Sequence, residues 1–360
     1  MTSTPPIEFR RSHQPILVTG GCGFIGSNIA DALAGRGERV VILDKMLRHG
    51  GETNAHWLKS RHGDRIEIVT GDVRDRRLLD DILRGVSGVF HLAGQVAVTT
   101  SLADPEEDFE INAAGTLRVL EATRRNNPEI PVLFASTNKV YGKLLEDDEI
   151  VRRGQQYVCM APAFASGVSE TAPLDLYSPY GCSKGAADQY VHDYARVFGL
   201  KTVVMRMSCI YGPRQFGTED QGWVAHFLIQ AIRGAPITIY GDGYQVRDVL
   251  FIDDAVAAWL RAFDRIGATR GRVFNLGGGV RNAVSLQDMI RLIADLRGHA
   301  PETRFDQWRP GDQAWYVSDV SAISRALDWT PRISPRQGLE MLERWLASQL
   351  GAPSRQEAHA

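Results

Sequence analysis

The sequence predicts an α/β protein, in which a doubly wound parallel sheet is followed by a smaller C-terminal α/β lobe. Between residues 16 and 206, short β-branched runs alternate with amphipathic stretches of helix length, which is the pattern of successive βαβ units. The runs are apolar throughout, as expected of strands buried on both faces of a parallel sheet. The chain of 360 residues is long for one domain, which favours a large domain with an additional lobe.

The predicted elements follow in order along the chain. Strands are expected at residues 16–18, 40–43, 66–69, 89–92, 132–136 and 202–206, with helices between them, for example at 26–37 and 113–126. Beyond about residue 210 the alternation weakens. Strands are then expected at 237–240 and 273–277 and helices at 285–296 and 336–350, in a lobe over the carboxyl edge of the sheet.

These elements predict three parts of the chain. Residues 1–205 form the large domain, which includes the helix with Tyr180 and Lys184. Residues 206–350 form mainly the lobe, with some chain returning to the large domain, and residues 351–360 form a flexible tail.

The composition argues against several classes of partner. The chain is 44% hydrophobic and 23% charged with a formal net charge of -2, so it has no basic field suited to nucleic acid or an anionic membrane. No segment approaches the ~18 consecutive apolar residues of a membrane helix, and the N-terminus lacks the apolar core of a signal peptide. We therefore expect a soluble, cytoplasmic protein with no nucleic-acid or membrane partner.

Neither a metal site nor a disulfide is expected. The four cysteines lie far apart and form no C-x-x-C pair: Cys22, Cys159, Cys182 and Cys209. Three histidines between residues 49 and 62 lie in a polar connecting region without the grouping of metal ligands. We interpret the cysteines as small packing residues and these histidines as exposed loop residues.

A glycine motif follows the first predicted strand. In "ILVTGGCGFIG", Gly20, Gly23 and Gly26 come directly after the strand and, with Phe24 and Ile25, open a helix. Glycine permits the tight turn, the close approach of backbone to a pyrophosphate, and close packing of helix on strand. The helix N-terminus then faces the phosphates. This context predicts a dinucleotide site of the Rossmann type.

Further positions extend the predicted dinucleotide site. Asp44 ends the second strand, where a carboxylate accepts from both ribose hydroxyls and repels a 2′-phosphate, which favours NAD over NADP. Lys45 and Arg48 lie close by and keep NADP as an alternative. Asp72 and Val73 are expected at the adenine, although Asp72 would equally suit a helix N-cap. Leu92, Ala93 and Gly94 end the fourth strand and are expected beside the pyrophosphate.

A candidate catalytic set follows this fingerprint. In "SPYGCSK", Tyr180 and Lys184 are four residues apart, which places both on one helix face. An ammonium and the positive nicotinamide ring would favour phenolate and lower the pKa of Tyr180, so that it serves as a base. Thr137, at the end of the preceding strand, supplies a hydroxyl that can bond the sugar oxygen being oxidised.

Together these motifs resemble those of the extended short-chain dehydrogenase/reductases, the NAD-dependent epimerases and dehydratases of nucleotide sugars. The resemblance rests on "TGGCGFIG", Asp44, "GDV", Thr137, "YGCSK" and "GDGYQVRD", and it covers nearly the whole chain. It implies a Rossmann-type NAD-binding domain that recycles NAD within each turnover, with Tyr180 as base and Asn112 beside the cofactor. It also implies a lobe that binds a nucleotide diphosphate sugar. The substrate residues implied are Gln95, Thr137, Asn138, Arg214, Arg247, Arg309 and Asp312.

The arginines suit that role because a guanidinium binds phosphate in a bidentate manner. From the residues alone, Arg247 and Arg309 would equally be surface ion pairs.

The residues after Thr137 indicate the reaction. The 4,6-dehydratases of this family carry Asp-Glu there as acid and base, whereas this chain has Asn138 and Lys139. We therefore expect an epimerase. Several segments, "STNKVYG" and "YGPRQFGTEDQGWV" among them, resemble the CDP-tyvelose (CDP-paratose) 2-epimerases, as does the long connection from 143 to 177. We interpret that connection as part of the sugar pocket, Asn138 as near the sugar, and Lys139 as tying down the connection.

The implied chemistry is direct oxidation at C2. A 4-keto sugar acidifies the protons at C3 and C5 but not at C2, so inversion at C2 is simplest through a 2-keto sugar and hydride return. Two alternatives stay open: a 4-epimerase on a UDP-, GDP- or CDP-sugar, and a redox-responsive NAD-binding regulator on the same fold. The resemblance also suggests a homodimer or homotetramer, built through helices near 111–125 and 185–198.

Overall fold

The structure, a computed structural model, describes residues 14–309 and 311–351. The predicted flexible tail lies outside the described residues except for Gly351.

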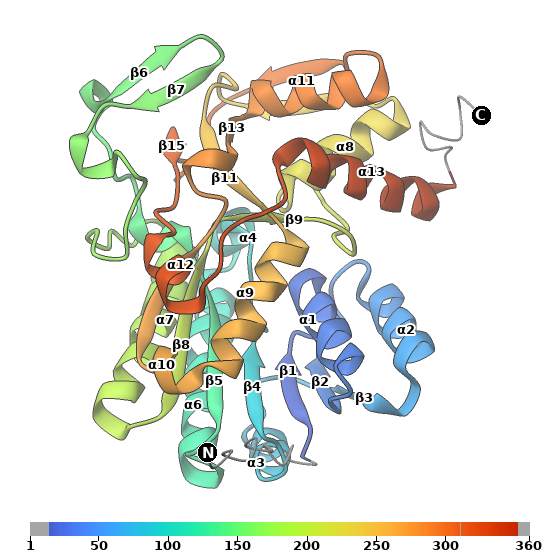
Figure 1. Ribbon diagram of the computed structural model, residues 1–360, viewed down its shortest axis with the longest axis vertical. Coiled ribbons are helices and arrows are strands. Elements are labelled where there is room, and N and C mark those ends of the chain that lie inside the picture. The colour runs from blue at the N-terminus through green and yellow to red at the C-terminus, as the bar shows by residue number, and fades with distance from the viewer. Residues whose placement is uncertain (1–13, 310, 352–360) are drawn as a thin grey trace, which may run out of the picture.

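A seven-stranded parallel sheet forms the centre of the molecule (Figure 1). Its strand order is β12-β8-β5-β4-β1-β2-β3, which confirms the predicted doubly wound fold. The order reverses between β1 and β4, and the loops that leave these strands diverge, which opens a crevice at the carboxyl edge. The strands are β1 (Ile16–Thr19), β2 (Val40–Asp44), β3 (Ile66–Thr70), β4 (Gly88–His91), β5 (Pro131–Thr137), β8 (Lys201–Met207) and β12 (Arg272–Leu276).

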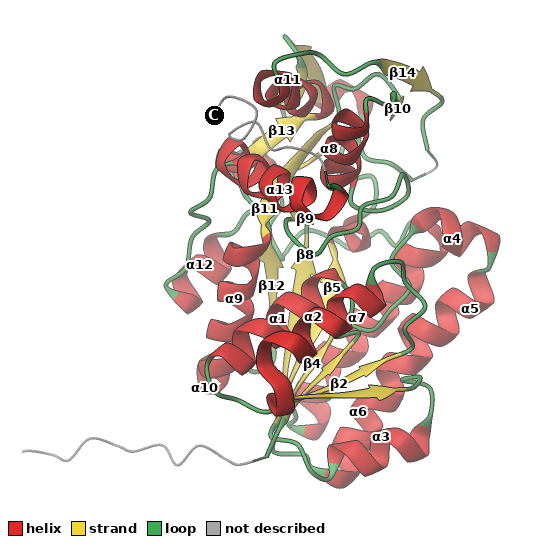
Figure 2. Cartoon of the chain, turned by 90° about the vertical axis from the view of Figure 1, so that its right-hand side faces the viewer, coloured by secondary structure: helices red, strands yellow, loops and turns green. Residues whose placement is uncertain are grey.

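Helices cover both faces of this sheet (Figure 2). One layer holds α1 (Phe24–Gly35), α2 (Gly51–His62) and α9 (Ile252–Asp264), and the other holds α3 (Arg76–Leu83), α6 (Gly115–Asn126) and α7 (Ser178–Phe198). Shorter helices pack on these layers: α4 (Val98–Ala103), α5 (Pro105–Phe109) and the π-helix η2 (Glu110–Ala114) on the second, and α10 (Ile266–Thr269) and α12 (Ser321–Leu327) beside α9.

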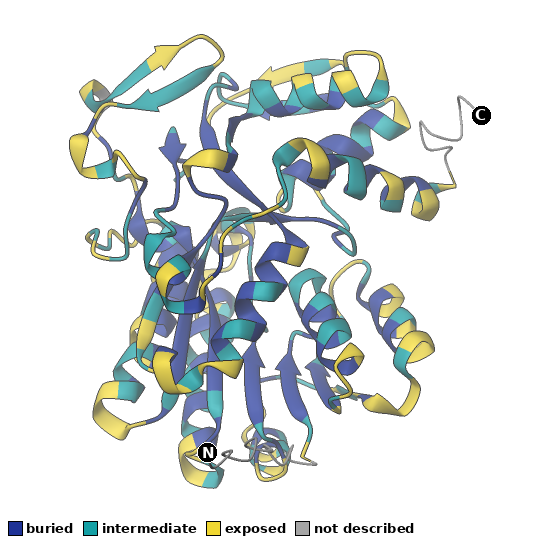
Figure 3. Cartoon of the chain, viewed as in Figure 1, coloured by how far each residue is buried: buried dark blue, intermediate teal, exposed yellow. Residues whose placement is uncertain are grey.

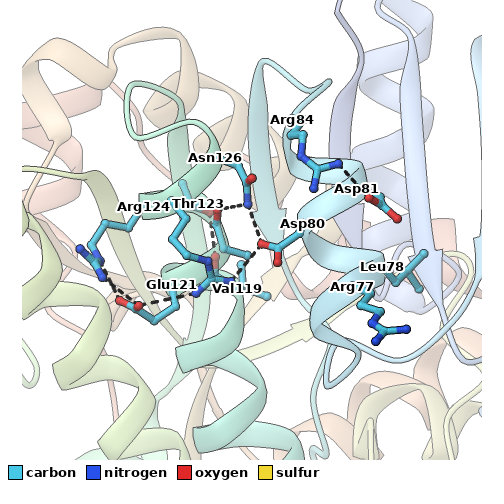
Figure 4. Close-up of polar contacts among 12 residues, drawn as sticks. Arg77, Leu78, Asp80, Asp81, Arg84, Val119, Glu121, Thr123, Arg124 and Asn126 are labelled. Carbon is cyan, nitrogen blue, oxygen red and sulfur yellow. Dashed lines mark hydrogen bonds and ion pairs between the residues drawn. The ribbon is translucent and has the colours of Figure 1, made fainter.

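The pair α3 and α6 shows how the second layer is held (Figure 4). Leu79 and Leu83 of α3 pack with Val119 and other buried side chains of α6. At the rim, the Asp80 carboxylate accepts hydrogen bonds from Arg125, at 2.9 Å, and from Asn126, at 2.6 Å. The hydrogen bond from Arg125 is the main cause that lowers the pKa of Asp80.

The second part of the chain forms a lobe beyond the carboxyl edge of the sheet (Figure 1). Its strands are β9 (Cys209–Tyr211), β11 (Val246–Phe251), β13 (Ala283–Ser285) and β15 (Trp315–Tyr316), with the separate parallel pair β10 (Ile237–Tyr240) and β14 (Thr303–Asp306). Its helices are α8 (Trp223–Arg233), α11 (Leu286–Arg297) and α13 (Pro335–Leu350).

The strand expected at 273–277 does not belong to the lobe. It is β12, which pairs in parallel with β8 and forms one edge of the central sheet. Helices α9 and α10 carry the chain back along the sheet to reach this edge. A local apolar pattern predicts a strand but not the sheet that it joins, and here that pattern led to the wrong sheet.

The connection from 143 to 177 contains a hairpin of β6 (Ile150–Arg153) and β7 (Gln156–Cys159). The hairpin rests on the lobe: the amide of Tyr157 donates to the carbonyl of Tyr244 at 2.9 Å, and the Arg152 guanidinium lies 3.6 Å from the centre of the Tyr244 ring. The remaining short 3-10 helices are η1 (Gly63–Arg65), η3 (Asn138–Tyr141), η4 (Asp147–Glu149), η5 (Pro162–Phe164) and η6 (Val280–Asn282).

The sheet and the lobe share one hydrophobic core (Figure 3). Phe90 of β4 packs on Trp259 of α9, and the same continuous cluster includes Phe251 of β11 and Leu342 of α13. This shared core holds the lobe over the strand ends, where the predicted site residues lie.

Candidate active site

The glycine turn between β1 and α1 is tightly packed. Gly20 has φ +67°, and a side chain there would come within 2.7 Å of the Ala93 amide nitrogen. A side chain at Gly26 would collide with the carbonyl oxygen of Gly20, and Gly23 caps α1, which begins with Phe24 and Ile25. The turn therefore brings bare backbone and the N-terminus of α1 to the crevice, an arrangement that fits the pyrophosphate of a dinucleotide.

Asp44 is held at the end of β2 by two backbone amides. Its carboxylate accepts from the amide of Cys22 at 3.0 Å and from that of Met46 at 2.8 Å. The two cations that kept NADP open have other partners: Lys45 pairs with Asp72 at 2.9 Å, and Arg48 donates to the Gln221 side chain. These contacts favour a ribose with free hydroxyls, as in NAD.

Asp72 is not a helix N-cap, because Asp75 caps α3. The Asp72 carboxylate instead accepts from the amide and the guanidinium of Arg74 and pairs with Lys45. Burial opposes ionisation, but these hydrogen bonds and charges hold the pKa of Asp72 well below its usual range. The Val73 side chain is buried in the core, so this residue can offer a ligand only its backbone.

The loop after β4 is fastened from both sides. The amides of Leu92 and Ala93 donate to the carbonyl and hydroxyl oxygens of Thr19, both at 3.1 Å. A side chain at Gly94 would lie 2.9 Å from Asn112 Oδ1 and 3.8 Å from Lys184 Nζ. Glycine thus allows this loop to approach the catalytic helix closely.

Asn112 supports the loop from behind. The side-chain oxygen of Asn112 accepts from the amide of Gln95 at 3.0 Å, and its side-chain nitrogen donates to Asp108 and Ser183, both at 3.1 Å. The Gln95 side chain differs from its prediction as a substrate residue. It turns inward, where its amide nitrogen donates to the Ala97 carbonyl and to Asp108 and its oxygen accepts from the Ala97 amide, so that both ends of this buried side chain have partners.

Thr137, Tyr180 and Lys184 converge at the carboxyl edge of the sheet. Thr137 ends β5 and is hydrogen-bonded to the Tyr180 side chain, while Lys184 follows Tyr180 by one turn of α7. Lys184 Nζ donates to the carbonyl of Ala135 at 2.5 Å and lies 4.3 Å from the centre of the Phe134 ring. Each of the three residues is less than a tenth exposed.

The protein groups around this set act on its protonation mainly through burial. Burial raises the pKa of Tyr180 to about 12; Thr137 and Arg48 oppose the rise, and the charge of Asp108 adds to it. Burial lowers the pKa of Lys184 to about 8, against the charges of Asp188 and Asp108. The surrounding chain therefore favours a phenol at Tyr180, and a lowered pKa needs a positive charge that comes with the bound cofactor.

A cleft of about 310 Å³ runs from this set into the lobe. Thr137, Asn138, Lys139 and Tyr180 line it on the sheet side. The lobe contributes residues that sequence reasoning did not single out as site residues, although the quoted segments "YGPRQFGTEDQGWV" and "GDGYQVRD" contain six of them: Glu219, Asp220, Gln221, Gly222, Trp223, His226, Phe227, Thr238, Tyr240, Gln245 and Leu286. Tyr240 directly precedes "GDGYQVRD", and this position could have indicated that it lies in the site.

Asp312 joins the two sides of the cleft. Its Oδ1 atom lies 2.7 Å from a guanidinium nitrogen of Arg247 and 3.3 Å from Lys139 Nζ. Burial would raise the pKa of Asp312, but the charges of Arg247 and Lys139 lower it to about 2. Lys139 therefore ties the segment after Arg309 to the sheet edge. The sequence analysis had instead expected it to hold the 143–177 connection.

Of the other two predicted arginines, only Arg309 faces the cleft. Its guanidinium lies 3.9 Å from the centre of the Tyr240 ring and 3.4 Å from the Asp220 carboxylate. Arg214 lies elsewhere, 3.9 Å from the centre of the Trp57 ring and close to Trp345, and is absent from the cleft lining. Arg214 instead packs between α2 and α13, and the structure does not bring it together with the other predicted substrate residues.

The 143–177 connection also differs from its prediction. Among the described residues, none of this segment lines the cleft. Its ends are held by other contacts, such as the amide of Asp175 donating to the carbonyl of Val140 at 3.1 Å. Its interpretation as part of the sugar pocket thus has no counterpart among the described residues that line this cleft.

Comparison with known proteins identifies the family. Residues 16–277 match the model of the NAD dependent epimerase/dehydratase family. This chain belongs to that family. NAD is its cofactor, and the chain is an epimerase of nucleotide sugars. The predicted resemblance to extended short-chain dehydrogenase/reductases is confirmed.

Several relatives within the family are similar over nearly their full length. The chain is 42% identical to the CDP-paratose 2-epimerase of Salmonella typhi, over 92% of this chain and 99% of the relative. It is 33% identical to the UDP-glucose 4-epimerase of Mycolicibacterium smegmatis, over 90% and 95%. The structure of the UDP-glucuronic acid 4-epimerase of Bacillus cereus in complex with UDP-glucuronic acid and NAD matches with a TM-score of 0.80 at 29% identity, over 93% and 99%.

No helix in the described parts of the chain has the length and apolar character required to cross a membrane.

Proposed function

We propose that this epimerase inverts C2 of a CDP-linked hexose of the paratose/tyvelose type, by transient oxidation to a 2-keto sugar. The observation that carries the proposal is the set Asn138, Lys139 and Asp312 beside Thr137 and Tyr180. Elimination requires a carboxylic acid that can protonate a departing hydroxyl. Asp312, paired with Lys139 and Arg247, has a pKa of about 2 and is ionised at neutral pH, so it cannot supply that proton.

Each residue then has a role at a stated atom. NAD, when bound, supplies a hydride acceptor and later a hydride donor. Tyr180 takes the proton of the C2 hydroxyl while Thr137 donates a hydrogen bond to the same oxygen. Lys184 supplies positive charge on the same helix face. The return step reverses the proton transfer: Tyr180 gives the proton back to the C2 oxygen after the sugar has presented its other face.

Binding of the diphosphate is assigned to Arg247 and Arg309, which reach the cleft from the lobe. Guanidinium groups suit this task because they bind phosphate in a bidentate manner. Similarity to the CDP-paratose 2-epimerase of Salmonella typhi, at 42% identity, supports C2 as the reacting carbon and CDP as the carrier. Relatives that are UDP-glucose 4-epimerases support the second candidate, inversion at C4 by the same three residues.

Isotope retention tests the proposal. The NAD-loaded enzyme is incubated with CDP-paratose and CDP-tyvelose deuterated at C2, and in parallel with UDP-glucose deuterated at C4. We expect the 2-epimer with its deuterium still on C2. Loss of that deuterium to water would contradict direct oxidation, and turnover of the C4 substrate alone would favour the second candidate.

A further inference from the structure

A buried carboxylate lies behind the catalytic helix. Asp108, in α5, is 1% exposed, and its carboxylate is hydrogen-bonded to three buried side chains. Its Oδ1 atom accepts from Gln95 Nε2 at 3.0 Å and from Asn112 Nδ2 at 3.1 Å, and its Oδ2 atom accepts from the Ser183 hydroxyl at 2.5 Å. All three partners donate hydrogen bonds, which is the arrangement that an ionised carboxylate requires.

The third of these bonds reaches the catalytic turn itself. Ser183 lies between Tyr180 and Lys184 in α7, and its hydroxyl is also 3.2 Å from the carbonyl oxygen of Tyr180. A bond from Ser183 to a fixed carboxylate therefore limits both the rotation and the sliding of this turn. Through Gln95 and Asn112, the same carboxylate is connected to the loop after β4.

The charges around Asp108 can be assigned to elements. On α7, the negative charge of Asp108 acts to raise the pKa of both Tyr180 and Lys184. Asp188, one turn further along the helix, also acts to raise the pKa of Lys184. From β4, the buried His91 is kept neutral, and Arg48 faces Tyr180 from the loop after β2. Burial raises the pKa of Asp108, which its three donors and Lys184 oppose.

We propose that Asp108 is a positioning residue of this enzyme, an ionised carboxylate that fixes the catalytic turn through Ser183 and keeps Lys184 an ammonium. The proposal rests on the proposed function only in taking Tyr180 and Lys184 as the reacting pair. Asp108 is buried and is not among the described residues that line the cleft. It acts by holding Ser183 and by its charge.

The test measures the titration of Lys184 in the NAD-loaded enzyme, which requires no substrate. Lysine is labelled with ¹³C at the ε-carbon, and the resonance is assigned with Lys184→Arg. In Asp108→Asn, which keeps the shape and removes the charge, we expect the Lys184 midpoint to fall by about one pH unit. Glu106→Gln is the matched control, because Glu106 is exposed on the same helix and its loss should leave the midpoint unchanged.

A second variant separates the bond from the charge. Ser183→Ala keeps the carboxylate but loses the hydrogen bond, so we expect an unchanged Lys184 midpoint and a turnover about tenfold lower. An unchanged midpoint in Asp108→Asn would overturn the role of the charge, even if the enzyme proves inactive on every sugar offered. Wild-type turnover in Ser183→Ala would overturn the role of the bond, and this outcome decides the matter if Asp108→Asn fails to fold.

Discussion

At the scale of single residues, the site combines groups whose protonation is set by burial more than by sequence neighbours. The pKa of Tyr180 is raised to about 12 although Lys184 lies one helical turn away, because enclosure of the phenol outweighs the hydrogen bond with Thr137, which acts to lower the pKa. The Lys184 ammonium is directed to the carbonyl of Ala135. A base that ionises only beside a positive ligand is protected from side reactions before that ligand is in place.

Loss of the Tyr180 hydroxyl tests the catalytic assignment. In Tyr180→Phe we expect turnover to fall about a thousandfold, the typical contribution of a positioned acid or base. The fold and the retained NAD should be unchanged, because the hydroxyl is hydrogen-bonded to Thr137, within the site itself. Steady-state kinetics and the absorbance of co-purified NAD provide the measurements.

Tyr190→Phe is the matched control for this variant. Tyr190 lies on the same helix but is 45% exposed, so its hydroxyl should be dispensable. Equal losses of turnover in the two variants would contradict a special role for Tyr180.

At the scale of elements, α7 is fixed to the sheet by a buried ionic network as well as by apolar packing. Asp188 pairs with Arg206 of β8 through two hydrogen bonds of 2.8 and 2.9 Å and accepts from Ser136 of β5 at 2.7 Å. Arg206 also donates to the Tyr141 hydroxyl. Such a network restrains the helix along its axis, because every charged group in it has a partner that would be costly to lose.

Strand β4 contains a buried histidine that makes stability depend on pH. His91 is hydrogen-bonded to the hydroxyl oxygens of Thr19, at 2.7 Å, and Thr116, at 3.1 Å. Burial, and secondarily the Lys184 charge, lower the pKa of His91 from 6.5 to about 3. Between these values the unfolded chain binds a proton that the folded chain does not, so the free energy of unfolding falls as the pH falls.

His91→Gln should remove this dependence. The wild-type free energy of unfolding is expected to fall more steeply than that of the variant, by about 1.4 kcal/mol per pH unit, as the pH drops from 6 to 4.5. Urea unfolding at several pH values measures the two slopes. His56→Gln, at an exposed position of α2, is the control and should keep the wild-type slope; parallel curves for His91→Gln and wild type would refute the assignment.

At the scale of the whole molecule, the substrate cleft is made by the sheet edge and the lobe, without the β6–β7 hairpin. The double variant Arg152→Ala/Tyr157→Phe removes the side-chain contacts of the hairpin with the Tyr244 ring and the Asp242 carboxylate, while the backbone bond from Tyr157 to Tyr244 stays. We expect a loss of about 1–2 kcal/mol in the free energy of unfolding and a KM within about twofold of wild type. Arg247→Ala, in the cleft lining, should instead raise KM; a rise of similar size in both would contradict this division.

The sequence was most informative where the physical cause is local. The β-branched run at 16–18 and the glycine turn after it depend on near neighbours, and both form as predicted. The direction of the Arg214 side chain depends on Trp57 and Trp345, which are distant in the chain. The pKa of Tyr180 likewise depends on enclosure by several elements. The position of a residue within a sequence motif therefore predicts neither the direction of the Arg214 side chain nor the pKa of Tyr180.

The fold also limits how the chain can be divided. Because β12 closes one edge of the central sheet after the chain has already built part of the lobe, no single cut yields two complete bodies. A fragment ending near residue 205 would leave the hydrogen-bonding groups of β8 open to pairing with other chains. The part that holds the cofactor and the part that completes the sugar cleft therefore fold together as one unit.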